Sequence, residues 1–238
     1  MNNKTTFYQK FISSSISNAY ALIIIASSFI YLIVFTLPFL LPQLYYTIPP
    51  VDYTKLTNYS PIGFFAYLFG LGTLFALFIG AVRLASHLPT ANSPWPTIRL
   101  VWMGSLIFAV ILLFSYPLTA IDLFIYAIRS RGWALYGLPP LSTPPELLPT
   151  SDPWLGLAGE WIDATSPYGP LWELIALGAF YLSGGSFLVQ IFLLKLVGLL
   201  AYLGCIGLIY RTLLLLQPNW AIVGSMAFAW NPLVLFES

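Results

Sequence analysis

The stretch AYALIIIASSFIYLIVFTLPFLL, residues 19–41, contains no charged side chain. A helix needs about 20 apolar residues to cross a bilayer, because the hydrocarbon core is roughly 30 Å thick and each residue rises about 1.5 Å. Further apolar runs lie at residues 62–84, 99–118, 171–183, 187–210 and 220–236. The sequence therefore predicts an all-α, polytopic transmembrane bundle with about six membrane helices.

The composition of the whole chain supports this class. Of the 238 residues, 59% are hydrophobic and 7% are charged, whereas a soluble domain carries about 25% charged residues. The formal net charge is +1 and no basic cluster is present, which excludes nucleic acid as a partner because phosphate neutralisation needs such a cluster.

Basic residues indicate the orientation of the chain. They precede the first run and flank the connection between the second and third runs: Lys4, Lys10, Arg83, His87 and Arg99. Because cytoplasmic loops carry an excess of Lys and Arg, we expect a cytoplasmic N-terminus. Residues 42–61 and 119–168 then lie on the outer face.

The segment at residues 119–170 is too long for a simple connection between two spans, since helix connections usually take about 2–8 residues. It is rich in aromatic side chains, namely Trp133, Tyr136, Trp154, Trp161 and Tyr168. Aromatic rings favour the membrane–water interface. We therefore predict an outer loop with helices lying in the interface.

The loop opens with a candidate catalytic constellation. Asp122, Tyr126 and Arg129 are spaced i, i+4 and i+7, so they share one face if this segment is helical. A carboxylate at the membrane rim can deprotonate a hydroxyl, and Arg129 and Arg131 can bind the phosphate of a lipid substrate. The alternative is an aspartate helix cap or a charged decoration of the interface. The spacing alone leaves both open.

Other polar residues are weaker candidates. Lys195 lies near the middle of the run at 187–210, where a charge marks a functional site, unless it snorkels or faces a water-filled cavity. Asp152, Glu160 and Asp163 are expected on a solvated face of the loop. One His and one Cys are too few for a zinc site. The outer-loop carboxylates could hold Mg²⁺ or Mn²⁺, but nothing in the sequence selects such a site, so no cofactor is predicted.

Three motifs occur in order in the second part of the chain: DLFIYAIRSRG at 122–132, SPYGPLW at 166–172 and AWNPLVLFE at 229–237. Together they resemble the GT-C glycosyltransferases, and most closely the bacterial polyprenol-phosphomannose-dependent mannosyltransferases. In that superfamily an early aspartate of a long outer loop is the catalytic base, and the donor is a sugar on a polyprenyl phosphate. Asp122 matches that aspartate.

The resemblance implies a membrane mannosyltransferase of a bacterial plasma membrane that acts on a lipid-linked or cell-envelope glycan. It implies substrate-binding roles for the other candidates: Tyr126, Arg129, Arg131, Tyr168, Trp172 and Lys195. It covers residues 98–238, which gives a first region of two spans at 1–97 and a GT-C-like module after it.

The chain departs from this family pattern in two places. Residues 137–140 read GLPP where relatives carry an Asn-Pro-Tyr-like turn. A second outer motif would lie beyond Ser238, so we expect this sequence to be truncated at its C-terminus and not necessarily active by itself.

A non-enzymatic transporter, flippase or scaffold subunit is the rival interpretation. Transporters typically contain paired broken helices in repeated halves. The Gly184-Gly185 break has no counterpart in this sequence, which favours the enzyme.

Overall fold

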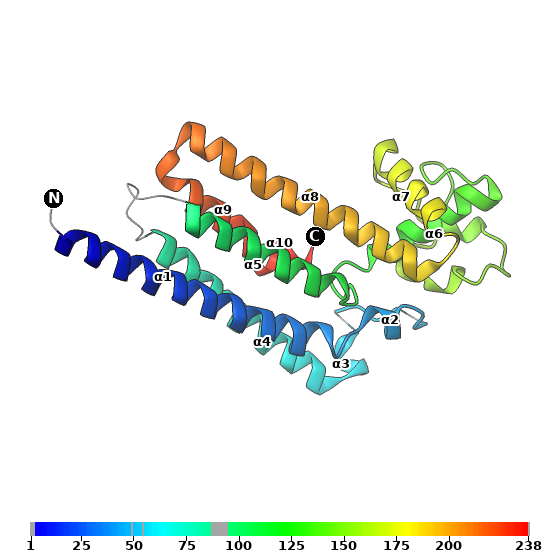
Figure 1. Cartoon of the computed structure of the whole chain (residues 1–238). Helices are drawn as coiled ribbons and strands as arrows, with labels where there is room; N and C mark the ends of the chain where they lie inside the picture. The colour runs from blue at the N-terminus through cyan, green and yellow to red at the C-terminus, as the bar shows by residue number, and fades with distance from the viewer. Residues whose placement is uncertain (1–2, 49, 54, 87–94, 238) are drawn as a thin grey trace. The chain divides into compact units, whose positions relative to one another are not determined.

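The computed structural model describes residues 3–48, 50–53, 55–86 and 95–237, and the side chains within them except those of residues 3–15, 95, 96 and 160. Its helices confirm the all-α class (Figure 1). In chain order they are α1 (Asn3–Ile30), α2 (Leu41–Leu44), α3 (Leu56–Tyr59), α4 (Pro61–Ser86), α5 (Trp95–Leu113), α6 (Asp122–Tyr136), α7 (Pro170–Leu182), α8 (Phe187–Leu216), α9 (Ala221–Ala229) and α10 (Pro232–Phe236). A π-helical segment, Tyr31–Thr36, continues α1.

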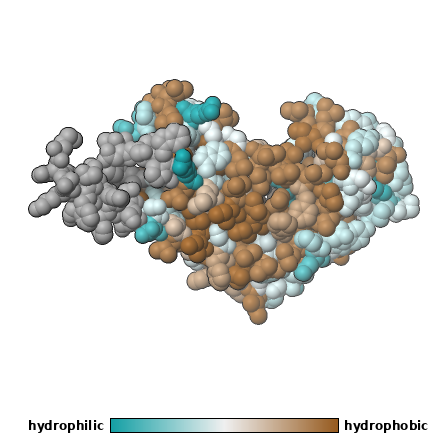
Figure 2. Space-filling view, viewed as in Figure 1, coloured by the Kyte–Doolittle hydropathy of each residue, from teal (hydrophilic) through white to brown (hydrophobic). Residues whose placement is uncertain are grey.

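Three of the described helical segments are long and apolar enough to cross a membrane, namely Ile16–Thr36, Pro61–Ser86 and Phe187–Leu216. Two shorter apolar segments are Thr97–Leu113 and Pro170–Leu182. Only 17% of the apolar window in α4 is buried inside the protein, so most of its side chains face outward. Figure 2 shows brown, hydrophobic side chains over much of the viewed surface of the long helices. The length and outward-facing apolar surface of these helices are those of an integral membrane protein.

The last predicted run, residues 220–236, is not one helix, so this prediction was wrong in detail. It divides into α9 and α10 at Trp230 and Asn231. Pro232 disfavours a helical conformation at the residue before it, and Asn231 is extended with φ −67° and ψ 119°. The Asn231 side chain accepts a hydrogen bond from the Leu233 N–H at 3.0 Å, which caps the new helix.

Contacts between residues divide the chain into two compact units, each discontinuous in sequence. Unit 1 comprises residues 1–38, 65–112 and 200–238, and unit 2 comprises residues 39–64 and 113–199. Helices α4 and α8 contribute residues to both. The boundary predicted at residue 97 rests on the extent of the family resemblance and not on contacts, so it stays a prediction.

An aromatic cluster forms the core of unit 1. Trp230 lies at its centre, with ring centroids 6.1 Å from Tyr20 and 5.7 Å from Phe108, and its indole N–H donates to the Val101 carbonyl at 3.2 Å. It fits because residue 104 is glycine, where a Cβ atom would lie 2.8 Å from the Trp230 ring. The AWNP motif is therefore a packing element of this unit.

Unit 2 contains the predicted outer loop, which is folded and not extended. It contains α6 and three short 3₁₀ turns between Pro145 and Trp161, and α7 follows it. Trp154 is buried, with its ring centroid 6.0 Å from Phe180 and 4.9 Å from Phe187, whereas Trp161 is 50% exposed. A helix within the loop is confirmed, and its direction relative to the membrane plane stays a prediction.

Two segments of unit 2 set where α5 ends and where the chain turns from α7 into α8. Helix α5 stops at Leu113, before the predicted end at residue 118, because Leu40 and Ser115 pair as an isolated bridge and the Leu41 N–H donates to the Phe114 carbonyl at 2.9 Å. Gly184 and Gly185 have φ values of 61° and 81°, which L side chains rarely adopt. This glycine pair allows the sharp turn from α7 into α8.

Candidate functional site

Helix α6 carries the predicted catalytic face. Asp122 lies in its first turn, where a carboxylate is favoured by the helix dipole. Gly137, with φ 66°, ends the helix and donates to the carbonyls of Gly132 and Trp133. Because the segment is helical throughout, Asp122, Tyr126 and Arg129 share one face, and α6 packs against α7.

An aromatic cluster of Tyr126, Tyr168 and Trp172 contacts the Asp122 carboxylate through Tyr168. The Tyr168 hydroxyl donates to Asp122 Oδ2 at 3.3 Å. The Tyr126 ring lies 5.0 Å from Tyr168 and 5.2 Å from Trp172, both nearly perpendicular. Asp122 is half-buried and Tyr168 is 37% exposed, so a ligand can reach the carboxylate. Burial and the hydrogen bond with Tyr168 raise the pKa of Tyr126, which keeps this phenol neutral.

Behind the rings, Arg129 fixes the segment that leads into α7. Its guanidinium is buried and donates through Nη2 to the carbonyls of Ala164 at 2.8 Å and Thr165 at 3.2 Å. Burial lowers the pKa of Arg129, and the negative charge of Glu173 opposes this effect. Arg129 of α6 and Glu173 of α7, which are far apart in sequence, therefore lie in one polar layer between the two helices.

Glu173 is a buried residue of the candidate site that sequence reasoning missed. It is 1% exposed and accepts a hydrogen bond from Ser166, whose hydroxyl oxygen in turn accepts the Tyr168 N–H at 3.2 Å. The available signal was an acidic residue at the start of an apolar run, since such charges are rarely placed without a role. Glu173 therefore helps to position Tyr168.

Several polar atoms of this layer have spare hydrogen-bonding capacity. Among the described side chains, Arg129 Nε, Trp172 Nε1 and Glu173 Oε2 are buried and have no hydrogen-bond partner. Such groups are normally satisfied by water or a ligand, because leaving one unpaired costs about 1–3 kcal/mol. Arg129 Nε and Trp172 Nε1 can donate to a hydroxyl or phosphate oxygen, and Glu173 Oε2 can accept from a hydroxyl group.

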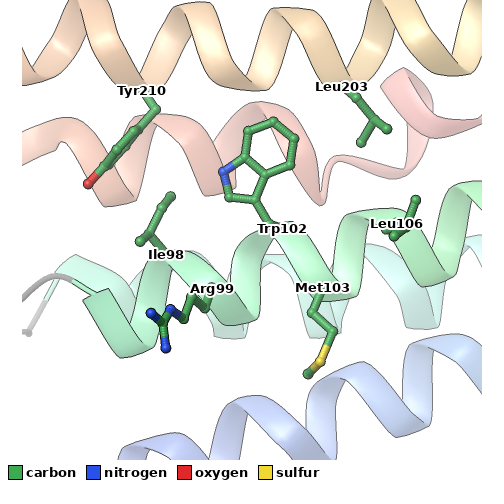
Figure 3. A pocket seen from close by; sticks show the side chains of 7 residues that line it. All are labelled: Ile98, Arg99, Trp102, Met103, Leu106, Leu203 and Tyr210. Carbon is green, nitrogen blue, oxygen red and sulfur yellow. The ribbon is translucent and has the colours of Figure 1, made fainter.

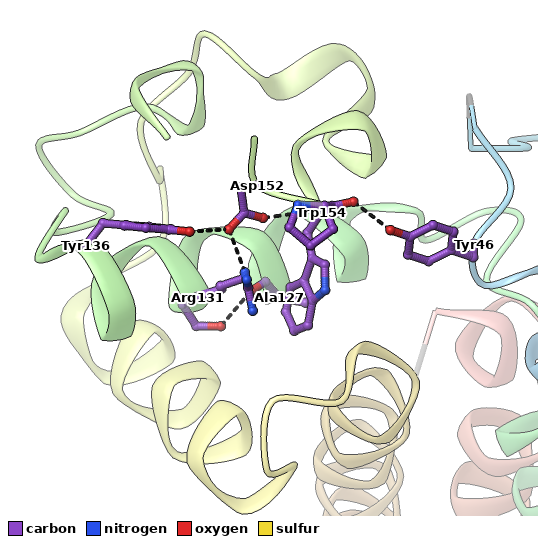
Figure 4. Close-up of polar contacts among 8 residues, drawn as sticks. Tyr46, Ala127, Arg131, Tyr136, Asp152 and Trp154 are labelled. Carbon is purple, nitrogen blue, oxygen red and sulfur yellow. Dashed lines mark hydrogen bonds and ion pairs between the residues drawn. The ribbon is translucent and has the colours of Figure 1, made fainter. Parts of the chain in front are cut away.

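Arg131 does not join this cluster. It lies on another face of α6, where its Nε donates to Asp152 Oδ2 at 2.8 Å and its guanidinium lies 4.6 Å from the Trp154 ring centroid (Figure 4). The Tyr136 hydroxyl donates to the same oxygen at 2.7 Å, and the Trp154 N–H donates to Asp152 Oδ1 at 2.9 Å. Arg131 is thus held in a structural ion pair.

The expectation that Asp152 faces solvent was wrong. Its side chain is 0% exposed, because the Pro-rich loop folds back and Arg131 and Tyr136 supply the donors that a buried carboxylate needs. Burial alone raises the pKa of Asp152, but the hydrogen bonds from Tyr136, Trp154 and Arg131 hold it below its usual range. Asp163 is exposed as expected, and the Glu160 side chain lies outside the described residues.

Lys195 lies in α8 and is 9% exposed. Its ammonium group donates a hydrogen bond to the Ser115 carbonyl, which lies just after α5. A buried lysine thus secures the start of the outer loop, and its predicted role toward a lipid phosphate stays a prediction. No group of three His, Cys, Asp or Glu side chains suited to a metal occurs in the part of the chain that the structure describes.

The described part of the chain is helical and built for a membrane, and it holds an accessible carboxylate beside an aromatic cluster. The family model of the alpha-(1->6)-mannopyranosyltransferase N-terminal domain matches residues 24–238, and the chain belongs to this family. This confirms the mannosyltransferase resemblance and extends it to α1 and α4, which the motifs did not cover. No curated protein and no solved structure matches the chain.

Proposed function

We propose that this chain is part of a GT-C-type mannosyltransferase that transfers mannose from a polyprenyl phosphate to a lipid-linked or cell-envelope glycan. The observation that carries the proposal is the Asp122 carboxylate, which accepts a hydrogen bond from Tyr168, whose ring packs with those of Tyr126 and Trp172. Aromatic rings offer apolar surface to the C–H face of a sugar, and the carboxylate offers a base.

In the proposed reaction the acceptor hydroxyl oxygen attacks the anomeric carbon of the donor. The bond from that carbon to the phosphate oxygen breaks, and its electron pair leaves with the lipid phosphate. Asp122 takes the acceptor proton. Arg129, whose buried Nε has no partner, and Lys195 on α8 would offset the negative charge that develops on the phosphate.

The donor can be tested directly with the full-length protein in proteoliposomes and a mannan acceptor. We expect transfer from mannosyl-phosphoryl-polyprenol and none from a nucleotide-linked mannose, because the lipid phosphate enters the site from the bilayer. Radiolabel in the glycan product is the readout. Efficient transfer from the nucleotide sugar without a lipid carrier would refute the proposed donor.

We also propose that the loop containing Asp122 lies outside the cytoplasm, as the positions of Arg83 and Arg99 suggest. Single cysteines replace the exposed residues Ser86 and Thr150 after the native, exposed Cys205 is changed to alanine. In intact cells an impermeant thiol reagent should label Thr150→Cys only, and both variants should react after lysis. Labelling of Ser86→Cys in intact cells would reverse the orientation.

A further inference from the structure

Unit 1 contains a groove that lies between α5 and α8 (Figure 3). Its volume is about 510 Å³. Most of its lining is apolar, contributed by Ile98, Met103, Leu106 and Leu203. All of the lining residues belong to unit 1, so the groove is formed within one compact body.

Trp102 organises the middle of this groove. It extends from α5 toward α8 (Figure 3), where a Cβ atom on Gly207 would lie 3.6 Å from the indole ring. The glycine thus lets the ring lie close to the α8 backbone. Flat apolar surface along two helices of a membrane protein suits a hydrocarbon chain, because a chain gains dispersion contacts there.

Polar groups lie at one end of the groove only. The Arg99 guanidinium and the Tyr210 hydroxyl belong to that end, and Leu106 and Leu203 lie at the other (Figure 3). Arg99 is exposed, so its charge is available to a ligand. A cation and a phenol at the mouth of an apolar groove match an amphiphile with an anionic head group and a hydrocarbon tail.

The position of Arg99 favours one source of such an amphiphile. The proposed orientation places Arg99 at the cytoplasmic surface, where the leaflet contains anionic phospholipids that bind basic pockets between membrane helices. Arginine binds a phosphate through two parallel hydrogen bonds. The charge therefore complements the lipid of that leaflet.

We propose that the groove between α5 and α8 binds an anionic glycerophospholipid, with its phosphate at Arg99 and Tyr210 and one acyl chain along Trp102. The site goes beyond the proposed transfer reaction, and the candidate catalytic residues take no part in it. Phospholipid abundance in the bilayer favours occupancy by mass action.

The test uses the full-length protein in phosphatidylcholine vesicles that contain a trace of phosphatidylglycerol with a photoreactive acyl chain. After illumination, peptide mapping should find the probe on residues 98–106 and 203–210. Unlabelled phosphatidylglycerol should displace it. A photoreactive phosphatidylcholine should label the same peptides at least about tenfold less, because its choline ammonium group offsets the charge of the phosphate that Arg99 binds.

Arg99→Gln should lower phosphatidylglycerol labelling about tenfold and leave folding intact, because the side chain is exposed. Arg83→Gln, an exposed arginine in the last turn of α4, is the matched control and should label normally. Equal labelling by the two phospholipids, or normal labelling of the Arg99 variant, would overturn the proposal. The proposal would also be overturned if polyprenyl phosphate displaced the probe and phosphatidylglycerol did not. The same holds if crosslinks to a second copy of the chain replaced lipid labelling.

Discussion

Asp122→Asn is expected to lower mannosyl transfer by the full-length enzyme at least about 10²-fold, the lower end of what a general base contributes. Asparagine keeps the size of the side chain and can still accept from Tyr168, which donates to Asp122 at 3.3 Å in the native structure. It cannot take the acceptor proton. The measurement is the initial rate of transfer at saturating donor, with the amount of folded protein determined in parallel.

Asp163→Asn is the matched control for this substitution. Asp163 lies in the same loop and is exposed, so its variant should transfer at the normal rate. A fully active Asp122 variant together with an inactive Asp163 variant would mean that Asp163, and not Asp122, is the base. Full activity of both variants would count against base catalysis by either residue. Asp152 is unsuitable as a control because it is buried and paired.

Asp152→Ala is expected to destabilise the folded loop by about 3 kcal/mol, as removal of one member of a buried ion pair does. The substitution leaves Arg131 without its carboxylate and removes the acceptor of Tyr136 and of the Trp154 N–H. Local opening should become roughly 10²-fold more frequent. Hydrogen exchange measured across residues 131–154 checks this.

Glu146→Ala supplies the comparison, because Glu146 is exposed in the same loop and its backbone N–H still donates to the Ile162 carbonyl. Its exchange should stay near that of the native protein. Unchanged protection in the Asp152 variant would mean that the buried ion pair contributes no stability.

The pKa of Asp152 lies below its usual range, so its carboxylate stabilises the folded loop above the unfolded pKa of about 3.9. This stabilisation is lost as the pH falls through the lower folded pKa. The difference in protection between the native protein and the Asp152 variant should therefore be constant from pH 7 to pH 5 and shrink only in strong acid.

Hydropathy was sufficient for the class of fold, because spanning helices differ from other segments in length and composition alone. Helical spacing likewise placed Asp122, Tyr126 and Arg129 on one face. What could not be predicted depends on contacts between distant residues. The burial of Asp152 requires Arg131 and Tyr136 from α6, and the layer containing Glu173 requires α7 to pack on α6. Local sequence reveals neither the residues that pair with Asp152 nor the helix that covers Glu173.

The arrangement around Asp122 also has a consequence for biogenesis. The carboxylate and its phenol donor, Tyr168, are separated by 46 residues, so at about 5–20 residues per second the ribosome completes the first roughly 2 to 9 seconds before the second. The carbonyls held by Arg129, those of Ala164 and Thr165, are made in the same late interval. A nascent chain that ends before Ala164 therefore has an Asp122 without its phenol donor and an Arg129 without its carbonyl partners. These contacts form only when the end of the loop has been synthesised and has folded back.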